Sequence, residues 1–151
     1  MTTQFTTNQQ KQEITQKLNS QFGISLSQDN LLIESSKEKI RLFTGNLTKE
    51  QIQEIEAIAP IEAIGLYFFK EEKDAQLRLS LDATHILKDN ITKNVTNLND
   101  NEASQWMQGN DLNKKAPKSI QVIQHNSDFL VCAKSTGEVL LNHIPKDRRI
   151  R

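Results

Sequence analysis

Apolar positions in the first part of the chain follow the spacing of a helix and then of a strand pair. Within residues 8–23, Ile14, Leu18 and Phe22 recur every four residues, and a glycine follows directly. This spacing places the three side chains on one face of a helix, and glycine is the usual residue just beyond a helix end. Residues 31–43 hold two short apolar runs around the turn Ser-Ser-Lys-Glu, which predicts a β-hairpin.

A second helix is predicted before Pro60. Thr48 can cap its start, because Gln51 follows three residues later in a capping-box arrangement. The residues expected to form its buried face are Leu47, Ile52, Ile55, Ile58 and Ala59.

Residues 61–72 are rich in β-branched and aromatic side chains and predict a central strand. Leu77, Leu79 and Leu81 alternate with polar residues, which predicts another strand, and Asp82 is expected to cap a short helical turn after it. The order helix, hairpin, helix, strand, strand is typical of an α+β layer with its helices on one face of a small mixed or antiparallel sheet.

The pattern changes after the turn Lys88-Asp89-Asn90. A strand is predicted over residues 91–98, then a short helix with Asp100 as its cap and Gly109 as its stop. Three strands follow, at residues 119–125, 129–135 and 138–144. Four strands around one helix predict a closed or nearly closed barrel. The expected fold class is therefore α+β, with a small N-terminal α/β domain over residues 1–90 and a C-terminal β-barrel over residues 91–151.

Composition narrows the class of protein. Hydrophobic residues make up 36% and charged residues 25% of the 151 residues, which is typical of a soluble globular protein. No apolar run is long enough to span a bilayer, and the N-terminus lacks the apolar core of a signal peptide, so we expect a cytoplasmic location and no membrane partner. Cys132 is the single cysteine, and the three histidines lack metal-ligand spacing, so neither a metal nor another cofactor is expected.

The zero net charge conceals a division along the chain. Residues 1–113 hold 11 lysines and arginines against 16 carboxylates, whereas residues 114–151 hold 8 against 3. An asymmetry of this kind favours an anionic partner for the basic part, and an uneven but merely solvated surface is the alternative.

Three motifs in the second part resemble a known family. They are the strand start Thr92-Lys93-Asn94-Val95, the helix end Trp106 to Asp111, and the stretch Asn142 to Arg149, which contains Pro145. Together they resemble the PUA-like domain at the C-terminus of archaeal Sun-type RNA cytosine-5 methyltransferases, and residues 20–90 look like the small domain that precedes it (a pre-PUA domain). One departure is Val131-Cys132-Ala133, where the family carries small residues with glycine.

The resemblance implies binding of structured RNA, either rRNA or tRNA. Arginine grips phosphate oxygens in pairs and lysine acts as a point charge, so basic residues near the second barrel strand and the C-terminus are expected to converge on one RNA-binding surface. The candidate RNA-binding residues are Lys93, Asn94, Lys114, Lys115, Lys118, Asn142, Lys146, Arg148, Arg149 and Arg151. For Lys93 and Asn94, a strand-end turn is an equally good interpretation.

Catalysis is not expected. Cys132 lies in the middle of a strand, where a buried and inert thiol is the ordinary finding, and no phosphate-binding glycine loop or catalytic cluster occurs. Trp106 and the run Tyr67-Phe68-Phe69 are expected in the core rather than as stacking platforms for bases. The main hypothesis is a non-enzymatic RNA-binding protein of ribosome biogenesis or RNA modification, with an RNA-modifying enzyme or a ribosomal subunit as a further partner. The alternative is a protein-interaction module of such a complex, binding through its acidic N-terminal domain.

Overall fold

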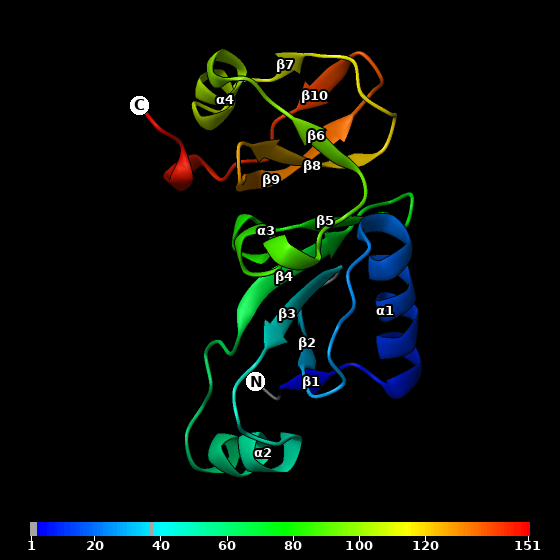
Figure 1. Ribbon diagram of the computed structural model, residues 1–151. Coiled ribbons are helices and arrows are strands. Elements are labelled where there is room, and N and C mark those ends of the chain that lie inside the picture. Colours follow the sequence, from blue (N-terminus) through cyan, green and yellow to red (C-terminus); the bar gives the residue numbers. More distant parts are fainter. Residues whose placement is uncertain (1–2, 37) are drawn as a thin grey trace.

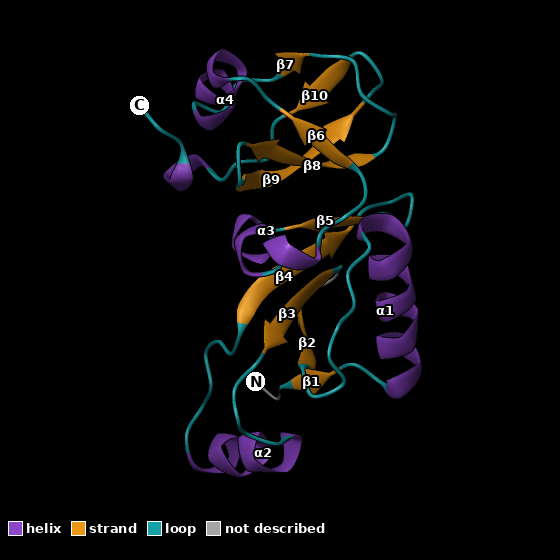
Figure 2. Ribbon diagram, viewed as in Figure 1, coloured by secondary structure: helices purple, strands orange, loops and turns teal. Residues whose placement is uncertain are grey.

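The chain folds into two five-stranded sheets, one for each part of the sequence. The computed structural model describes residues 3–36 and 38–151 (Figure 1). The first sheet has the strand order β1-β2-β3-β4-β5 and the second the order β6-β8-β9-β10-β7. Figure 2 shows α1 along one side of the first sheet, α3 between the two sheets and α4 next to the second.

Every neighbouring pair in the first sheet is antiparallel. The expected α+β character and the hairpin over residues 31–43 are thereby confirmed. The five strands are β1 (Gln4–Phe5), β2 (Leu31–Ser36), β3 (Lys39–Phe43), β4 (Leu66–Glu71) and β5 (Leu77–Leu79).

Helix α1 (Asn8–Phe22) covers this sheet as the apolar spacing predicted. Leu18 and Phe22 are fully buried in a cluster with side chains of the sheet. Thr7 caps the helix in a reciprocal capping box, and Gly23 ends it in the left-handed conformation at φ 75°.

Helix α2 (Lys49–Ile58) begins with the predicted capping box between Thr48 and Gln51. It does not lie on the face of the sheet but beyond the strand ends, at the end of the molecule farthest from the second sheet (Figure 1). The prediction of its buried face was largely wrong, because Ile52 is buried whereas Ile58 is 88% exposed.

The connection between the sheets consists of α3 (Leu81–Ile86) and the 3-10 turn η1 (Lys88–Asn90). The cap of α3 is Ser80, whose hydroxyl accepts a hydrogen bond from the Ala83 N–H, and not Asp82 as predicted.

The second sheet starts with a parallel pair, β6 (Val95–Asn97) beside β8 (Ile120–His125). The other strands are β7 (Leu112–Asn113), β9 (Asp128–Ser135) and β10 (Val139–Leu141). Within the described residues, no strand pairing joins the outer strands β6 and β7, so the closure of a barrel is not shown.

Helix α4 (Asp100–Met107) crosses over between β6 and β7. Its cap is Asn99 and not Asp100, because Asn99 and Glu102 form the reciprocal capping box. Trp106 is fully buried and donates its indole N–H to the Leu130 carbonyl over 2.8 Å, which confirms its expected place in the core.

The two sheets share their apolar packing. Ile120, Val122 and Cys132 of the second sheet belong to the cluster that α1 and the first sheet form, whereas Leu81 of α3 packs into the cluster of the second sheet. All strands of the first sheet precede residue 90 and all those of the second follow it. The limits 1–90 and 91–151 stay a prediction, because the apolar clusters cross this boundary.

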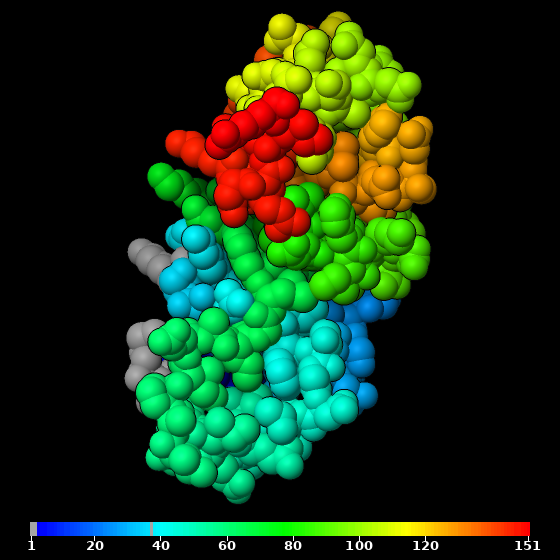
Figure 3. Space-filling model, turned by 90° about the vertical axis from the view of Figure 1, so that its left-hand side faces the viewer, coloured from blue at the N-terminus to red at the C-terminus, as the bar shows by residue number. Residues whose placement is uncertain are grey.

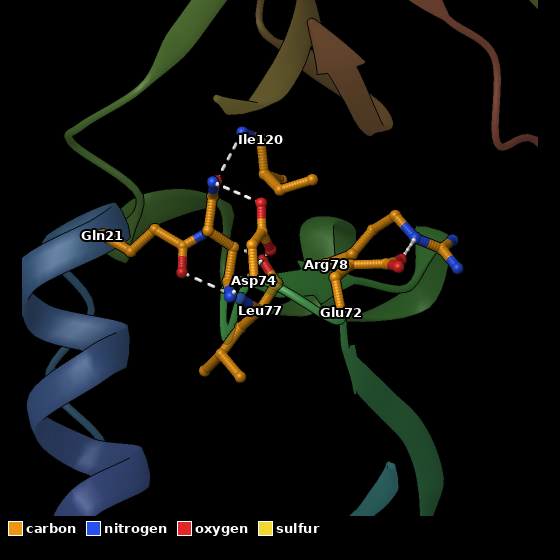
Figure 4. A network of polar contacts seen from close by, with 7 residues as sticks. Gln21, Glu72, Asp74, Leu77, Arg78 and Ile120 are labelled. Carbon is orange, nitrogen blue, oxygen red and sulfur yellow. Dashed lines mark hydrogen bonds and ion pairs between the residues drawn. The ribbon is translucent and has the colours of Figure 1, made fainter. Parts of the chain in front are cut away.

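Polar contacts also join the sheets, at the turn between β4 and β5 (Figure 4). Gln76 accepts a hydrogen bond from the Ile120 N–H over 2.9 Å and donates to Asp74 over 3.0 Å. Gln21 of α1 holds the next residue, Leu77, by donating to its carbonyl and accepting from its N–H. The turn is therefore fixed from both sides.

Candidate nucleic-acid interface

The closing segment, residues 142–151, is tied to the second sheet before it reaches its basic residues. Pro145 precedes the 3-10 turn η2 (Lys146–Arg148), and the side chain of Ile144 is buried. The Ile150 N–H donates to the Met107 carbonyl at the end of α4 over 2.8 Å. The segment therefore contacts the C-terminal end of α4, and Figure 3 shows it in red on the surface next to α3.

Asn142, a candidate RNA contact, is occupied by this anchoring. Its amide nitrogen donates to the carbonyls of Trp106 and Asn110, at 2.8 and 3.0 Å, and its amide oxygen accepts from the Ile144 N–H at 2.8 Å. Because both ends of the amide are already bonded to the main chain, the residue positions the closing segment.

Arg149 is partly buried because its side chain also contacts the closing segment and the end of α4. Its Nε donates to the Ile144 carbonyl over 3.1 Å, and its guanidinium group lies directly against Gly109. Gly109 has φ 94°, and a Cβ atom at this position would collide with the guanidinium group. The glycine after Trp106, one of the motifs of the resemblance, thus makes room for the arginine seven residues after Asn142.

Arg148 links the closing segment to α3 through an ion pair with Asp82, 3.2 Å long and about half exposed on both sides. Such an exposed pair contributes little to stability and leaves most of the guanidinium group accessible. Lys146 and Arg151 are exposed, and no carboxylate of residues 3–36 and 38–151 lies within ion-pair distance of either. We call Lys146, Arg148, Arg149 and Arg151 the basic tip.

Lys93 and Asn94 lie at the boundary between the two parts of the chain. The N–H groups of Thr92 and Lys93 donate to the Phe22 carbonyl, and Asn94, at φ 57°, donates its amide to the Gln21 carbonyl over 2.5 Å. The Asn94 carbonyl accepts from the Val122 N–H. These contacts make the segment a turn that fixes the start of β6. The Lys93 side chain is exposed and makes no polar contact with the described residues.

The lysines before β8 differ in whether their charge is paired with a carboxylate. Lys114 forms an ion pair of 3.0 Å with Glu102, partly buried on both sides, whereas Lys115 and Lys118 are exposed. Hydrogen bonding to the Asn99 N–H and then to Lys114 lowers the pKa of Glu102 below its ordinary value. Lys114 therefore connects the loop between β7 and β8 to the first turn of α4 through this ion pair.

The expectation of one converging basic surface is wrong. In Figure 1 the loop that carries Lys115 and Lys118 lies on the side of the second sheet opposite the basic tip. Lys93 and Lys118 precede two parallel strands, which start at the same end of the sheet. These two lysines therefore lie on the same side of the sheet, away from the basic tip. The free cations therefore form two groups.

The cysteine and two of the aromatic candidates lie in the core. Cys132 is fully buried, and this burial raises its pKa to about 12, so the thiolate that a nucleophile requires does not form near neutral pH. Phe68 and Phe69 are buried in the core, as predicted. Among the described residues, no group of three or more histidines, cysteines or carboxylates is placed to hold a metal ion.

A polar cluster that the sequence did not reveal lies between the sheets. Arg78 and Glu72 form a short ion pair of 2.6 Å, with 17% of each side chain exposed. Burial alone would raise the pKa of Glu72, but the hydrogen bond and charge of Arg78 outweigh it and the pKa is lowered. Burial and then the charge of Arg78 lower the pKa of the nearby His143. No spacing rule connects positions 72, 78 and 143, so only the fold could bring them together.

No helix among the described residues has both the length and the apolar character that crossing a membrane requires.

A family model matches the second part of the chain. Residues 93–150 match the family model described as the methyltransferase RsmF PUA domain. No curated protein matches the chain. The second sheet, α4 and the closing segment are therefore similar to a PUA domain, which supports the resemblance, while the archaeal origin and the pre-PUA character of residues 1–90 stay predictions.

Proposed function

We propose that this chain is a non-enzymatic, cytoplasmic RNA-binding protein that uses its PUA-like domain to hold structured rRNA or tRNA in ribosome biogenesis or RNA modification. The match of residues 93–150 to a PUA domain carries this proposal. In this role the chain brings an RNA-modifying enzyme or a ribosomal subunit to its RNA, and it needs no cofactor of its own.

The basic tip is the surface that best suits an RNA backbone. Pro145 and the contacts of Asn142 and Ile150 fix its course, so little conformational entropy is lost on binding. Lys146 and Arg151 are free of ion pairs with described carboxylates, and Arg148 retains exposed guanidinium nitrogens for phosphate oxygens. The tip therefore presents a preformed row of cations.

Charge reversal tests this assignment. The double variant Lys146→Glu with Arg151→Glu is preferable to changes at Arg148 or Arg149, because those two arginines also contact Asp82 and Ile144. Fluorescence anisotropy with labelled tRNA and rRNA hairpins should show a loss of affinity of at least about tenfold. Binding to about four phosphates should also give a slope of roughly −3 to −4 for log affinity against log salt concentration.

The matched control reverses the same number of charges on the other side of the sheet, in Lys115→Glu with Lys118→Glu. It should weaken binding far less than the tip variant. Equal losses would show that net charge and not the tip is responsible, and no binding of either RNA by the unaltered chain would refute the proposed function.

A specific observation favours the alternative, a protein-interaction module. Between α1 and the first sheet lies a cavity of about 570 Å³ with an apolar floor of Ile14, Ile40 and Phe69. Among the described residues, its rim carries four carboxylates, from Glu13, Glu34, Glu38 and Glu71, and one cation, Lys17. A basic protein segment fits this charge, and a partner copurifying after nuclease treatment that is lost with Ile40→Glu would support this second function.

A further inference from the structure

The exposed large apolar side chains of this protein gather in two places. In the part of the chain that the structure describes, they are Leu47, Ile55, Ile58, Ile86 and Ile150. Single exposed apolar side chains are ordinary, but grouped ones mark contact sites. The first three lie on or next to α2, and the last two lie on α3 and in the closing segment.

The first group, Leu47, Ile55 and Ile58, is named here the α2 surface. Ile58 is 88% exposed, which is unusual for a large aliphatic side chain at the end of a well-capped helix. The segment that carries it, residues 49–62, holds Glu50, Glu54, Glu56 and Glu62 against Lys49, and Arg41 of β3 lines the same pocket as Glu62. Lys49 lies over the Phe5 ring, at 5.5 Å from its centroid, and Glu56 accepts hydrogen bonds from Thr3, but both groups keep their charges. Residues 49–62 therefore carry a net charge of −3, from four carboxylates and one lysine.

The second group, Ile86 and Ile150, is named the α3–tail surface. The Arg148–Asp82 ion pair holds the closing segment against α3, and Asp82 lies one helical turn from Ile86. Ile86 and Ile150 are 56% and 59% exposed. The two segments that carry this surface, residues 81–90 and 146–151, hold more cations than carboxylates: Lys88, Lys146, Arg148, Arg149 and Arg151 against Asp82, Asp89 and Asp147.

One chain cannot join its own two surfaces. In Figure 1 and in the turned view of Figure 3, α2 lies at one end of the molecule, while α3 and the closing segment lie beside the second sheet. Each surface holds exposed aliphatic side chains, and the segments that carry the two surfaces have net charges of opposite sign. They are therefore complementary to each other between molecules.

We infer that a second copy of this chain binds here, with the α2 surface of one molecule seated on the α3–tail surface of the next. Opposite charges favour this orientation and oppose pairing of like surfaces. Because the two surfaces differ, the contact is head-to-tail, and further copies can add at each end. The contact uses part of the basic tip, so RNA and a second copy compete for it, although neither requires the other.

Oligomeric state tests the inference directly. Sedimentation velocity of the full chain from about 5 to 500 μM should show a mass that rises with concentration and falls as salt screens the charges. The substitution Ile58→Asp or Ile150→Asp should each weaken association by at least about tenfold, since a buried aliphatic anchor is replaced by a charge. Gln53→Asp is the control, because it adds the same charge to α2 away from Ile55 and Ile58.

A mixing experiment distinguishes this arrangement from other contacts. The Ile58→Asp chain keeps an intact α3–tail surface, and the Ile150→Asp chain keeps an intact α2 surface. Each should be monomeric alone, and an equimolar mixture should form dimers that do not grow further. Circular dichroism checks that both variants are folded, as expected for exposed positions.

Three results would overturn the inference: an unaltered chain that stays monomeric throughout, association unaffected by Ile58→Asp, or a mixture that stays monomeric. The α2 variant should still bind RNA with unchanged affinity, because the basic tip is intact. A failure of self-association is therefore distinguishable from a failure of RNA binding.

Discussion

The side chain of Gln76, in the turn between β4 and β5, accepts a hydrogen bond from the main-chain N–H of Ile120 at the start of β8. The distance is 2.9 Å, and Ile120 is 1% exposed. This contact joins the two sheets at a buried point (Figure 4).

Replacing Gln76 with alanine should lower the free energy of unfolding by about 1–3 kcal/mol, because a buried N–H loses its acceptor. Urea unfolding followed by circular dichroism measures this change. Gln53→Ala on exposed α2 is the control and should change stability by less than about 0.5 kcal/mol. Equal effects in both variants would mean that the Ile120 N–H finds another acceptor.

Gly109→Ala should destabilise the fold by about 1–3 kcal/mol, since φ 94° strains any residue with a Cβ atom and the methyl group meets the Arg149 guanidinium. Thermal unfolding provides the measurement. The double variant with Arg149→Ala separates the two causes: the collision disappears and the backbone strain remains. If Gly109→Ala is as stable as the unaltered chain, the close contact of Gly109 with Arg149 is not maintained in solution.

The Glu102 carboxylate should make stability depend on pH in the acid range. Its pKa is lower in the folded chain than in the unfolded chain, because of the Asn99 N–H and Lys114. Its contribution is therefore present above the unfolded pKa and is lost as the pH falls through the folded pKa. Unfolding free energies of Glu102→Gln, measured from pH 7 downward, should fall less steeply than those of the unaltered chain, and parallel curves would contradict the assignment.

Cys132 should resist alkylation in the folded chain. Burial raises its pKa to about 12, so at pH 8 almost no thiolate is present or accessible. Mass spectrometry after iodoacetamide treatment should find modification only in denaturant. Rapid modification of the folded protein would reopen the idea of a reactive cysteine.

Much of the fold follows from local sequence signals. The spacing of Ile14, Leu18 and Phe22 predicted α1, and the Thr48 and Gln51 pair predicted the start of α2. The caps of α3 and α4 were misassigned to Asp82 and Asp100 because aspartate is itself a good cap. Glu102, three residues after Asn99, was the signal that would have identified the capping box of α4.

The candidate site was less predictable, because it depends on contacts between distant residues. The sequence does not show whether the charge of a basic residue is free, as in Lys146, or paired with a carboxylate, as in Lys114. Asn142 resembled a surface contact, but the turn after α4 brings two carbonyls to its amide. Likewise, the apolar face of α2 predicted burial, while the position of the helix beyond the strand ends leaves Ile55 and Ile58 in solvent.

The apolar cluster that contains both Phe22 and Val122 has a consequence for how the chain responds to its ligands. Because neither sheet can open without exposing side chains of the other, we expect the two sheets to unfold as one cooperative unit, so a ligand bound to either one stabilises both. An RNA held only by the last ten residues would thus slow amide exchange even in α1, at the opposite end of the sequence.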